Sequence, residues 1–167
     1  GRFGILIDAP ADADMGGAGP LAGKPYLSGY TTENIINWRW TTVGNSKFLS
    51  LVVLEETAYE DDDGFEATEV PQWRELRMVP KDPEAENPEF ILAVRLHRQV
   101  DGELVVVDES FPTMGNGKNW DIIPFCFIGS VDNDPTVDKP PMEGMAHVNI
   151  AHYRNSADYE ESVFMLG

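Results

Sequence analysis

The hydrophobic pattern of the sequence changes once, near Trp120, and that change limits the folds open to the chain. Before it, apolar and polar residues alternate in short runs separated by Gly, Pro, Asn and Asp, a pattern typical of antiparallel strands. An apolar run at 122–129 and an acidic, Pro-rich segment at 130–141 lead to residues 142–166, which have apolar side chains at spacings of three or four. The pattern predicts a mainly β (α+β) fold, in which an antiparallel, hairpin-rich β body is followed by a C-terminal helix.

The β body is expected to contain seven to nine strands joined mostly as hairpins. The expected strands are residues 3–8, 25–30, 37–40, 47–59, 70–79, 90–99, 104–109 and 122–129. The run from Glu60 to Gly64 should form the acidic tip of a long hairpin loop, and residues 11–24 a flexible loop or hairpin connection. Asp101-Gly102 is a strong signal for a two-residue turn.

Two local predictions concern the second expected strand and the residues after it. Tyr26 and Tyr30 should lie on one face of that strand, because side chains alternate along a strand. Thr31 or Thr32 is predicted to cap a single helical turn that runs through Ile35-Ile36.

The chain is divided into a β-rich domain at 1–129, a connector at 130–141 and a helix at 142–167. Pro140 and Pro141 suit the first turn of this helix, and Asp138 is the expected N-cap. The helix is only weakly amphipathic, so it should gain its stability by packing on neighbours. Both ends of the chain are expected to be cuts within a longer protein, with the helix leading to a missing region.

Charge is the unusual feature of the composition. Twenty-nine acidic residues against twelve Lys and Arg give a net charge of −17, which disfavours binding to nucleic acid. No apolar run approaches the roughly 18 residues of a membrane span, and no signal peptide is expected. Cys126 stands alone between Phe125 and Phe127, so it is expected to be a buried small hydrophobe without a disulfide partner.

No pattern in the sequence indicates a catalytic, cofactor or metal site, so the chain is not expected to be an enzyme. Three histidines are too few and too badly spaced for a metal site, and the acidic clusters at 60–64 and 132–138 favour solvated turns. Carboxylates are abundant, yet nothing singles out an acid and base pair for glycoside hydrolysis.

Four tryptophans leave a second function class open. Trp38 and Trp40 should share a strand face and could form a platform on which sugars stack. Core packing or a subunit contact is the favoured role for Trp38, Trp40, Trp73 and Trp120, because tryptophan supplies large apolar area in either setting.

Three segments of the chain together resemble a family of bacteriophage and prophage proteins related to portal proteins, often classed only as a domain of unknown function. The segments are GRFGILID at 1–8; KPY at 24–26 with YTTENIINWR at 30–39; and IPF at 123–125 with DKPP at 138–141 and HYRNSADYE at 152–160. The resemblance extends over nearly the whole chain, and the third segment is specific. It singles out nine motif residues with a structural role or a role in subunit contacts: Trp38, Arg39, Pro124, His152, Tyr153, Arg154, Asn155, Ser156 and Tyr159.

The resemblance implies a virion structural protein. Portal proteins form dodecameric rings at one capsid vertex, where they make the channel for DNA packaging and ejection. The chain would be part of the peripheral wing, found in the virion and in the host cytoplasm during assembly. Its partners would be identical subunits in a ring, terminase, and neck or tail proteins, without direct nucleic-acid binding by this fragment. A carbohydrate-binding β-module and another phage neck or tail component are the alternatives.

Overall fold

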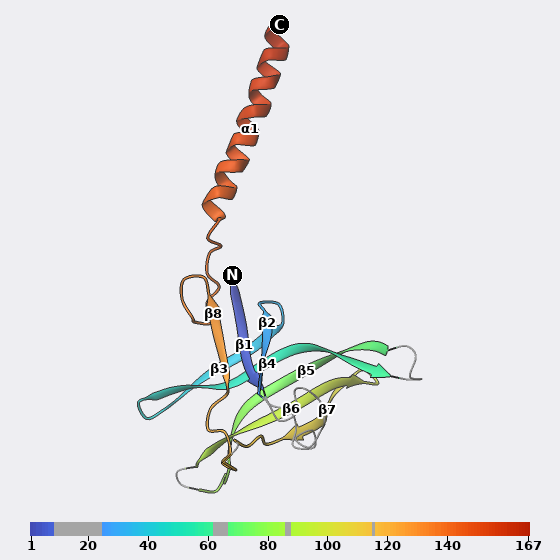
Figure 1. Ribbon diagram of the computed structural model, residues 1–167, viewed down its shortest axis with the longest axis vertical. Coiled ribbons are helices and arrows are strands. Elements are labelled where there is room, and N and C mark those ends of the chain that lie inside the picture. The colour runs from blue at the N-terminus through green and yellow to red at the C-terminus, as the bar shows by residue number, and fades with distance from the viewer. Residues whose placement is uncertain (9–24, 62–66, 86–87, 115) are drawn as a thin grey trace. The chain divides into compact units, whose positions relative to one another are not determined.

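The computed structural model describes residues 1–8, 25–61, 67–85, 88–114 and 116–167 (Figure 1). The predicted loop at 11–24 and the Asp62 to Gly64 part of the acidic tip lie outside the described residues. The chain forms two units, Phe3–Cys126 and a second made of Gly1–Arg2 with Phe127–Gly167. Eight described strands in two antiparallel sheets and one C-terminal helix confirm the predicted fold class.

The larger sheet contains five consecutive strands in chain order, β3-β4-β5-β6-β7, and every neighbouring pair is antiparallel. These strands are β3 (Ile35–Val43), β4 (Ser46–Asp61), β5 (Ala67–Pro80), β6 (Phe90–Val100) and β7 (Glu103–Ser110). Short turns make this order possible. Asp101 and Gly102 both have positive φ, 53° and 86°, which confirms the predicted two-residue turn between β6 and β7.

The smaller sheet has the order β2-β1-β8, from β1 (Arg2–Asp8), β2 (Tyr26–Thr31) and β8 (Phe125–Gly129). The backbone N–H of Ile7 donates to the carbonyl of Pro124 over 2.9 Å. The last strand is shorter than the predicted run at 122–129. Phe125 N–H turns back to the carbonyl of Ile123 over 2.8 Å, and Pro124 has no N–H to offer a ladder, so the strand begins at Phe125.

The main part of the core lies on one face of the five-stranded sheet and against β1, and Leu51 and Ala93 are buried on the other face. Val52 pairs with Leu76, and Met78 pairs with Leu92, so these four apolar side chains share a face. The largest fully buried side chains are Leu6, Leu54, Leu92 and Val52. Burial of aliphatic side chains of this size typically contributes about 1.5–3 kcal/mol each.

The predicted helical turn through Ile35-Ile36 is wrong. Asn34 N–H bonds to the carbonyl of Thr31 over 3.2 Å, which makes a turn, and β3 starts at Ile35. Ile35 is buried and pairs with Leu54. The strand forms in place of a helical turn because the consecutive β-branched residues Ile35 and Ile36 suit a strand better than a helix.

Helix α1 covers Glu143–Leu166, close to the predicted 142–167, but Asp138 is not its cap, and Pro140 and Pro141 precede the helix instead of lying in its first turn. Met142 occupies the N-cap position without a side-chain hydrogen bond. Instead Oδ2 of Asp138 accepts from the backbone N–H groups of Val131, at 2.8 Å, and Asp132, at 3.4 Å. These backbone donors lower the pKa of Asp138 and close the preceding loop.

Cys126 is exposed, which contradicts its expected burial. Its neighbours Phe125 and Phe127 are both buried. Because successive side chains of a strand point to opposite faces, two buried neighbours require the residue between them to face outward.

Candidate interaction surfaces

A polar network connects the two sheets within residues 3–126, and Glu56 of β4 lies at its centre. One carboxylate oxygen, Oε1, accepts from the hydroxyl of Tyr30 at 2.6 Å and from Nε of Arg74 at 2.7 Å. The other, Oε2, accepts from the amide of Gln72 at 3.0 Å. Three donors on β2 and β5 therefore satisfy one half-buried acid.

Arg74 extends this network from β5 to β1. Its Nη1 donates to Oδ2 of Asp8 at 3.2 Å, and the same oxygen accepts from the hydroxyl of Tyr26 at 3.2 Å. Tyr26 and Tyr30 thus face acids of the same network, and the prediction that they share a strand face is confirmed. Two acids, two tyrosines and one guanidinium hold β1 and β2 against β4 and β5.

The surroundings of Glu56 and Tyr30 favour an ionised carboxylate and a neutral phenol. Burial by itself raises the pKa of Glu56, but hydrogen bonds from Arg74 and Tyr30 bring it below its ordinary value. Burial and the bond to Glu56 raise the pKa of Tyr30 above its ordinary range. At neutral pH the acid is ionised and the phenol is neutral. A general base requires a pKa close to the working pH, which neither group has, so the network suits a structural role.

A second ionic cluster lies on the opposite face of the same sheet and is centred on Glu75. Nε of Arg77 donates to Oε1 of Glu75, and Nε2 of His97 lies 2.8 Å from Oε2. Arg95 lies 3.8 Å from Glu75 and donates to Glu109 of β7 at 2.6 Å. Burial tends to raise the pKa of Glu75, and the bond from Arg77 outweighs it, so the pKa lies below its ordinary value. The cluster joins β5, β6 and β7.

The structure assigns His97 to this ionic cluster rather than to a metal site. Among the described residues no three His, Cys, Asp or Glu side chains come close enough together to hold a metal ion. In the acidic segment at 132–138, Asp134 accepts from the backbone N–H of Thr136 at 2.7 Å. With Asp138 closing the same loop, these acids act in local turns.

The first group of motif residues lies on β3 and next to β8. Trp38 is half-buried and pairs with Val52, whereas Arg39 is exposed. Pro124 is half-buried, and its carbonyl is the acceptor for Ile7 described above.

Trp40, the other half of the proposed sugar platform, is 40% exposed. The Nζ of Lys47 lies 5.3 Å from the centre of its ring, a cation–π arrangement. The ammonium thus occupies one face of the Trp40 ring.

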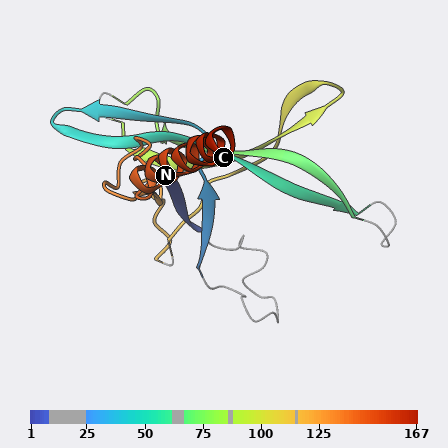
Figure 2. The same ribbon diagram turned by 90° about the horizontal axis from the view of Figure 1, so that it is seen from above.

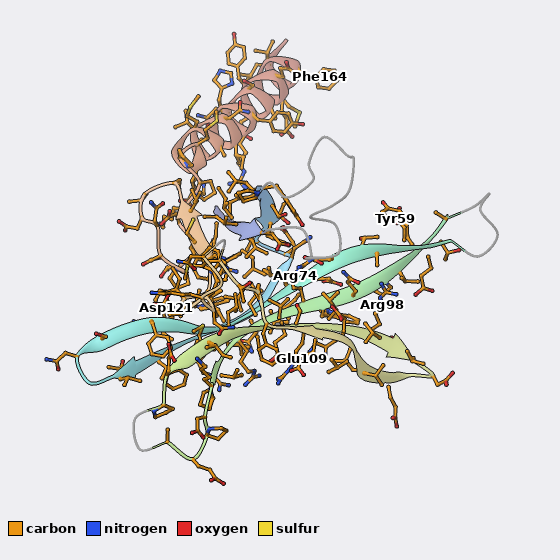
Figure 3. All side chains as sticks on the ribbon, turned by 60° about the horizontal axis from the view of Figure 1, so that its bottom comes forward. Tyr59, Arg74, Arg98, Glu109, Asp121 and Phe164 are labelled. Atoms are coloured by element: carbon orange, nitrogen blue, oxygen red, sulfur yellow. The ribbon has the colours of Figure 1, made fainter. Side chains whose placement is uncertain are left out.

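The remaining motif residues, His152, Tyr153, Arg154, Asn155, Ser156 and Tyr159, all lie on α1 and are all exposed. None of the 24 residues of α1 is buried. Phe164, near the C-terminal end, is 86% exposed and projects outward from the helix (Figure 3). No helix among the described residues is both long enough and apolar enough to cross a membrane.

Sequence reasoning missed the pairing of Glu56 with Arg74. A signal was present, because Glu56 follows the apolar run 51–54 of β4 and Arg74 lies on the partner strand of the predicted hairpin. Two opposite charges on the core side of adjacent strands indicate a buried ion pair once the register is known.

The sequence was compared with protein-family models and with curated proteins. No family model matches the chain, and no curated protein matches it either.

Proposed function

We propose that this chain is a structural subunit of a phage virion, part of the wing of a portal-like ring that acts through protein–protein contacts. The observation that carries the proposal is α1. A helix of 24 residues in a folded protein normally buries one face, since most helical stability comes from packing of that face. Within its own unit, Gly1–Arg2 with Phe127–Gly167, no residue of the helix is buried.

The apolar side chains of α1 are arranged so that a partner could cover them. Residues at spacings of three, four and seven make one stripe, which we call the Tyr153 stripe: Ala146, Ile150, Tyr153, Ala157 and Phe164. Met145, Tyr159 and Val163 expose further apolar area on another side. Two apolar sides suit a helix that packs between neighbours, as in a ring of helices.

Two further observations support an assembly role. Within the Glu56 cluster and within the Glu75 cluster, the polar side chains form hydrogen bonds and ion pairs to one another, as groups with a structural role do. The net charge of −17 disfavours binding to DNA and suits a surface that contacts other proteins and solvent.

The proposal is tested by electron microscopy and mass photometry of the chain together with its native flanking sequence. We expect rings of about a dozen subunits with cyclic symmetry. Ile150→Ser and Tyr153→Ser should weaken ring formation, whereas Asp158→Asn, which lies between the apolar sides of α1, should leave it intact. A protein that stays monomeric with its native flanks would exclude the portal role.

Two observations would distinguish the portal role from a neck or tail component and from a carbohydrate-binding module. A large terminase gene next to the gene for this protein supports the portal assignment over a neck or tail component. Glycan-array binding that disappears on Trp38→Ala would support the carbohydrate-binding module instead.

A further inference from the structure

The edge strand β7 has the features of a strand that accepts another strand. All eight of its residues are exposed, and residues 104–107 form an uninterrupted apolar run, with Leu104 61% and Val106 51% exposed. Folded monomers usually protect edge strands with lysine, proline, β-bulges or short length, because open edges pair with other chains. The register of β7 shifts between Val106 and Asp108, so the regular part of its open edge is 103–106. The β6–β7 hairpin carries this run away from the centre of its sheet (Figure 2).

Backbone geometry shows which groups of β7 are available. Val100 and Glu103 flank the two-residue turn and so form a hydrogen-bonded pair of the antiparallel ladder. Because bonded and non-bonded pairs alternate, the N–H and C=O groups of Leu104 and Val106 point to the outer edge. Among the described residues, no strand pairs with that edge.

The opposite edge of the same sheet, β3, matches β7 in length and exposure. It has nine residues against eight in β7 and exposes Ile36, Trp40 and Val43. Val43 and Ser46 flank the two-residue turn Gly44-Asn45, so by the same alternation Thr42 directs its N–H and C=O outward.

Charge decides which edges fit together. β7 carries Glu103, Asp108 and Glu109 and no cation, whereas the one charged residue of β3 is Arg39. Two β7 strands side by side would bring six carboxylates together, and like charges on facing strands are destabilising. A β7 strand beside β3 instead places acids near Arg39.

We propose that β7 of one copy pairs with β3 of a second copy, so that the five-stranded sheet continues from subunit to subunit. The contact uses two different surfaces of the same chain, so it is head-to-tail and can close into a ring. Added backbone hydrogen bonds supply affinity, as in other strand-addition complexes. The inference rests on the proposed function, because it names a contact through which identical subunits would meet.

The test is a complementation experiment with Val106→Pro and Thr42→Pro. Both residues direct their N–H outward, so proline removes an intermolecular donor and no bond inside the sheet. Each variant alone should lose self-association, by about tenfold or more in dissociation constant. An equal mixture should form heterodimers and nothing larger, because each variant retains one intact edge. Val106→Thr and Thr42→Val are matched controls that keep the N–H and should associate like the parent protein.

The result is measured by analytical ultracentrifugation, with circular dichroism to confirm folding. A parent protein that is monomeric at all concentrations overturns the inference. So does Thr42→Pro that assembles normally while Val106→Pro does not, since that pattern indicates β7 pairing with itself. If either proline variant fails to fold, a comparison of Arg39→Glu with Arg39→Lys replaces it. Only the charge reversal should weaken self-association. If the two Arg39 variants associate equally well, the inference is overturned.

The two proposals can fail separately. Rings that persist in the protein with native flanks when Val106 is proline remove the edge contact and leave the portal role. Successful complementation without rings of the flanked protein removes the portal role and leaves the edge contact.

Discussion

Nε of Arg74 donates a hydrogen bond of 2.7 Å to Oε1 of Glu56 across the β4–β5 pair. The two residues are diagonal neighbours, because Glu56 pairs with Gln72 and Arg74 pairs with Leu54. Their side chains are 14% and 21% exposed, so most of the charge of each is removed from water. The pair therefore belongs to the interior, where loss of one partner is costly.

Arg74→Met should destabilise the protein by about 2–4 kcal/mol, because it leaves the Glu56 carboxylate buried without its main partner. Urea denaturation measures this loss. A double-mutant cycle with Glu56→Gln should show that the two effects are not additive. Lys81→Met, which breaks the exposed pair between Lys81 and Glu89, is the matched control and should change stability by about 0.5 kcal/mol or less. If Arg74→Met and Lys81→Met changed the stability equally, the pair of Glu56 with Arg74 would not be a buried ion pair.

The stability of the protein should depend on pH partly through Glu56. The pKa of this carboxyl is lower in the folded chain than in the unfolded chain. Its contribution is therefore present above the ordinary glutamate pKa, about 4.3, and is lost as the pH falls through the lower folded value. Glu56→Gln should be less stable than the parent at pH 7, and the difference should shrink in acid. A difference that stays constant from neutral to acidic pH would contradict the assigned role.

Gly4 should not tolerate a larger residue. A Cβ at this position would lie 2.3 Å from Cζ of Phe125 and 3.0 Å from Cδ1 of Ile35, and both of those side chains are buried. Gly4→Ala should cost about 1–3 kcal/mol through overpacking. Gly144→Ala on α1 is the control, because a Cβ there meets nothing within 4 Å, and it should cause no loss. Thermal unfolding compares the two, and an unchanged Gly4→Ala would contradict the packing of β1 on Phe125.

The thiol of Cys126 should react in the native protein. Because its side chain is exposed, a thiol-specific colorimetric reagent should modify it without denaturant. The reaction should reach one thiol per chain, as it does after unfolding, and Cys126→Ser should abolish it. A thiol that reacts only in denaturant would restore the burial that the sequence suggested.

Strand positions could be predicted because they depend on local alternation. The runs at 47–59, 70–79 and 90–99 each repeat with a period of two, and the structure places β4, β5 and β6 over them. Turn chemistry was equally local, since Asp101-Gly102 permits the positive φ values of a two-residue hairpin.

Predictions failed where a residue had two local roles open to it. Asp138 has the chemistry of an N-cap, yet backbone donors at Val131 and Asp132 engage its carboxylate instead. The Thr31 to Ile36 segment could start a helix, yet Leu54 offers Ile35 a buried strand partner. In both cases a contact with a residue outside the segment itself decided the outcome: Val131 and Asp132 for Asp138, and Leu54 for Ile35.

By itself, the sequence determined the sheet-then-helix architecture, the hairpins of 47–59 with 70–79 and of 90–99 with 104–109, and the approximate extent of α1, because periodicity and turn residues act over a few positions. The order of the strands in the two sheets came only from the structure. Tertiary structure alone decided that Glu56, Arg74, Asp8 and Tyr30 form one network, and that β3 and β7 become the open edges of one sheet. Asp8 and Arg74 of this network are 66 positions apart in the sequence, so no local pattern encodes their contact. The physical reason is that burial and register, which depend on the whole sheet, determine which charges meet and which backbone edges remain open.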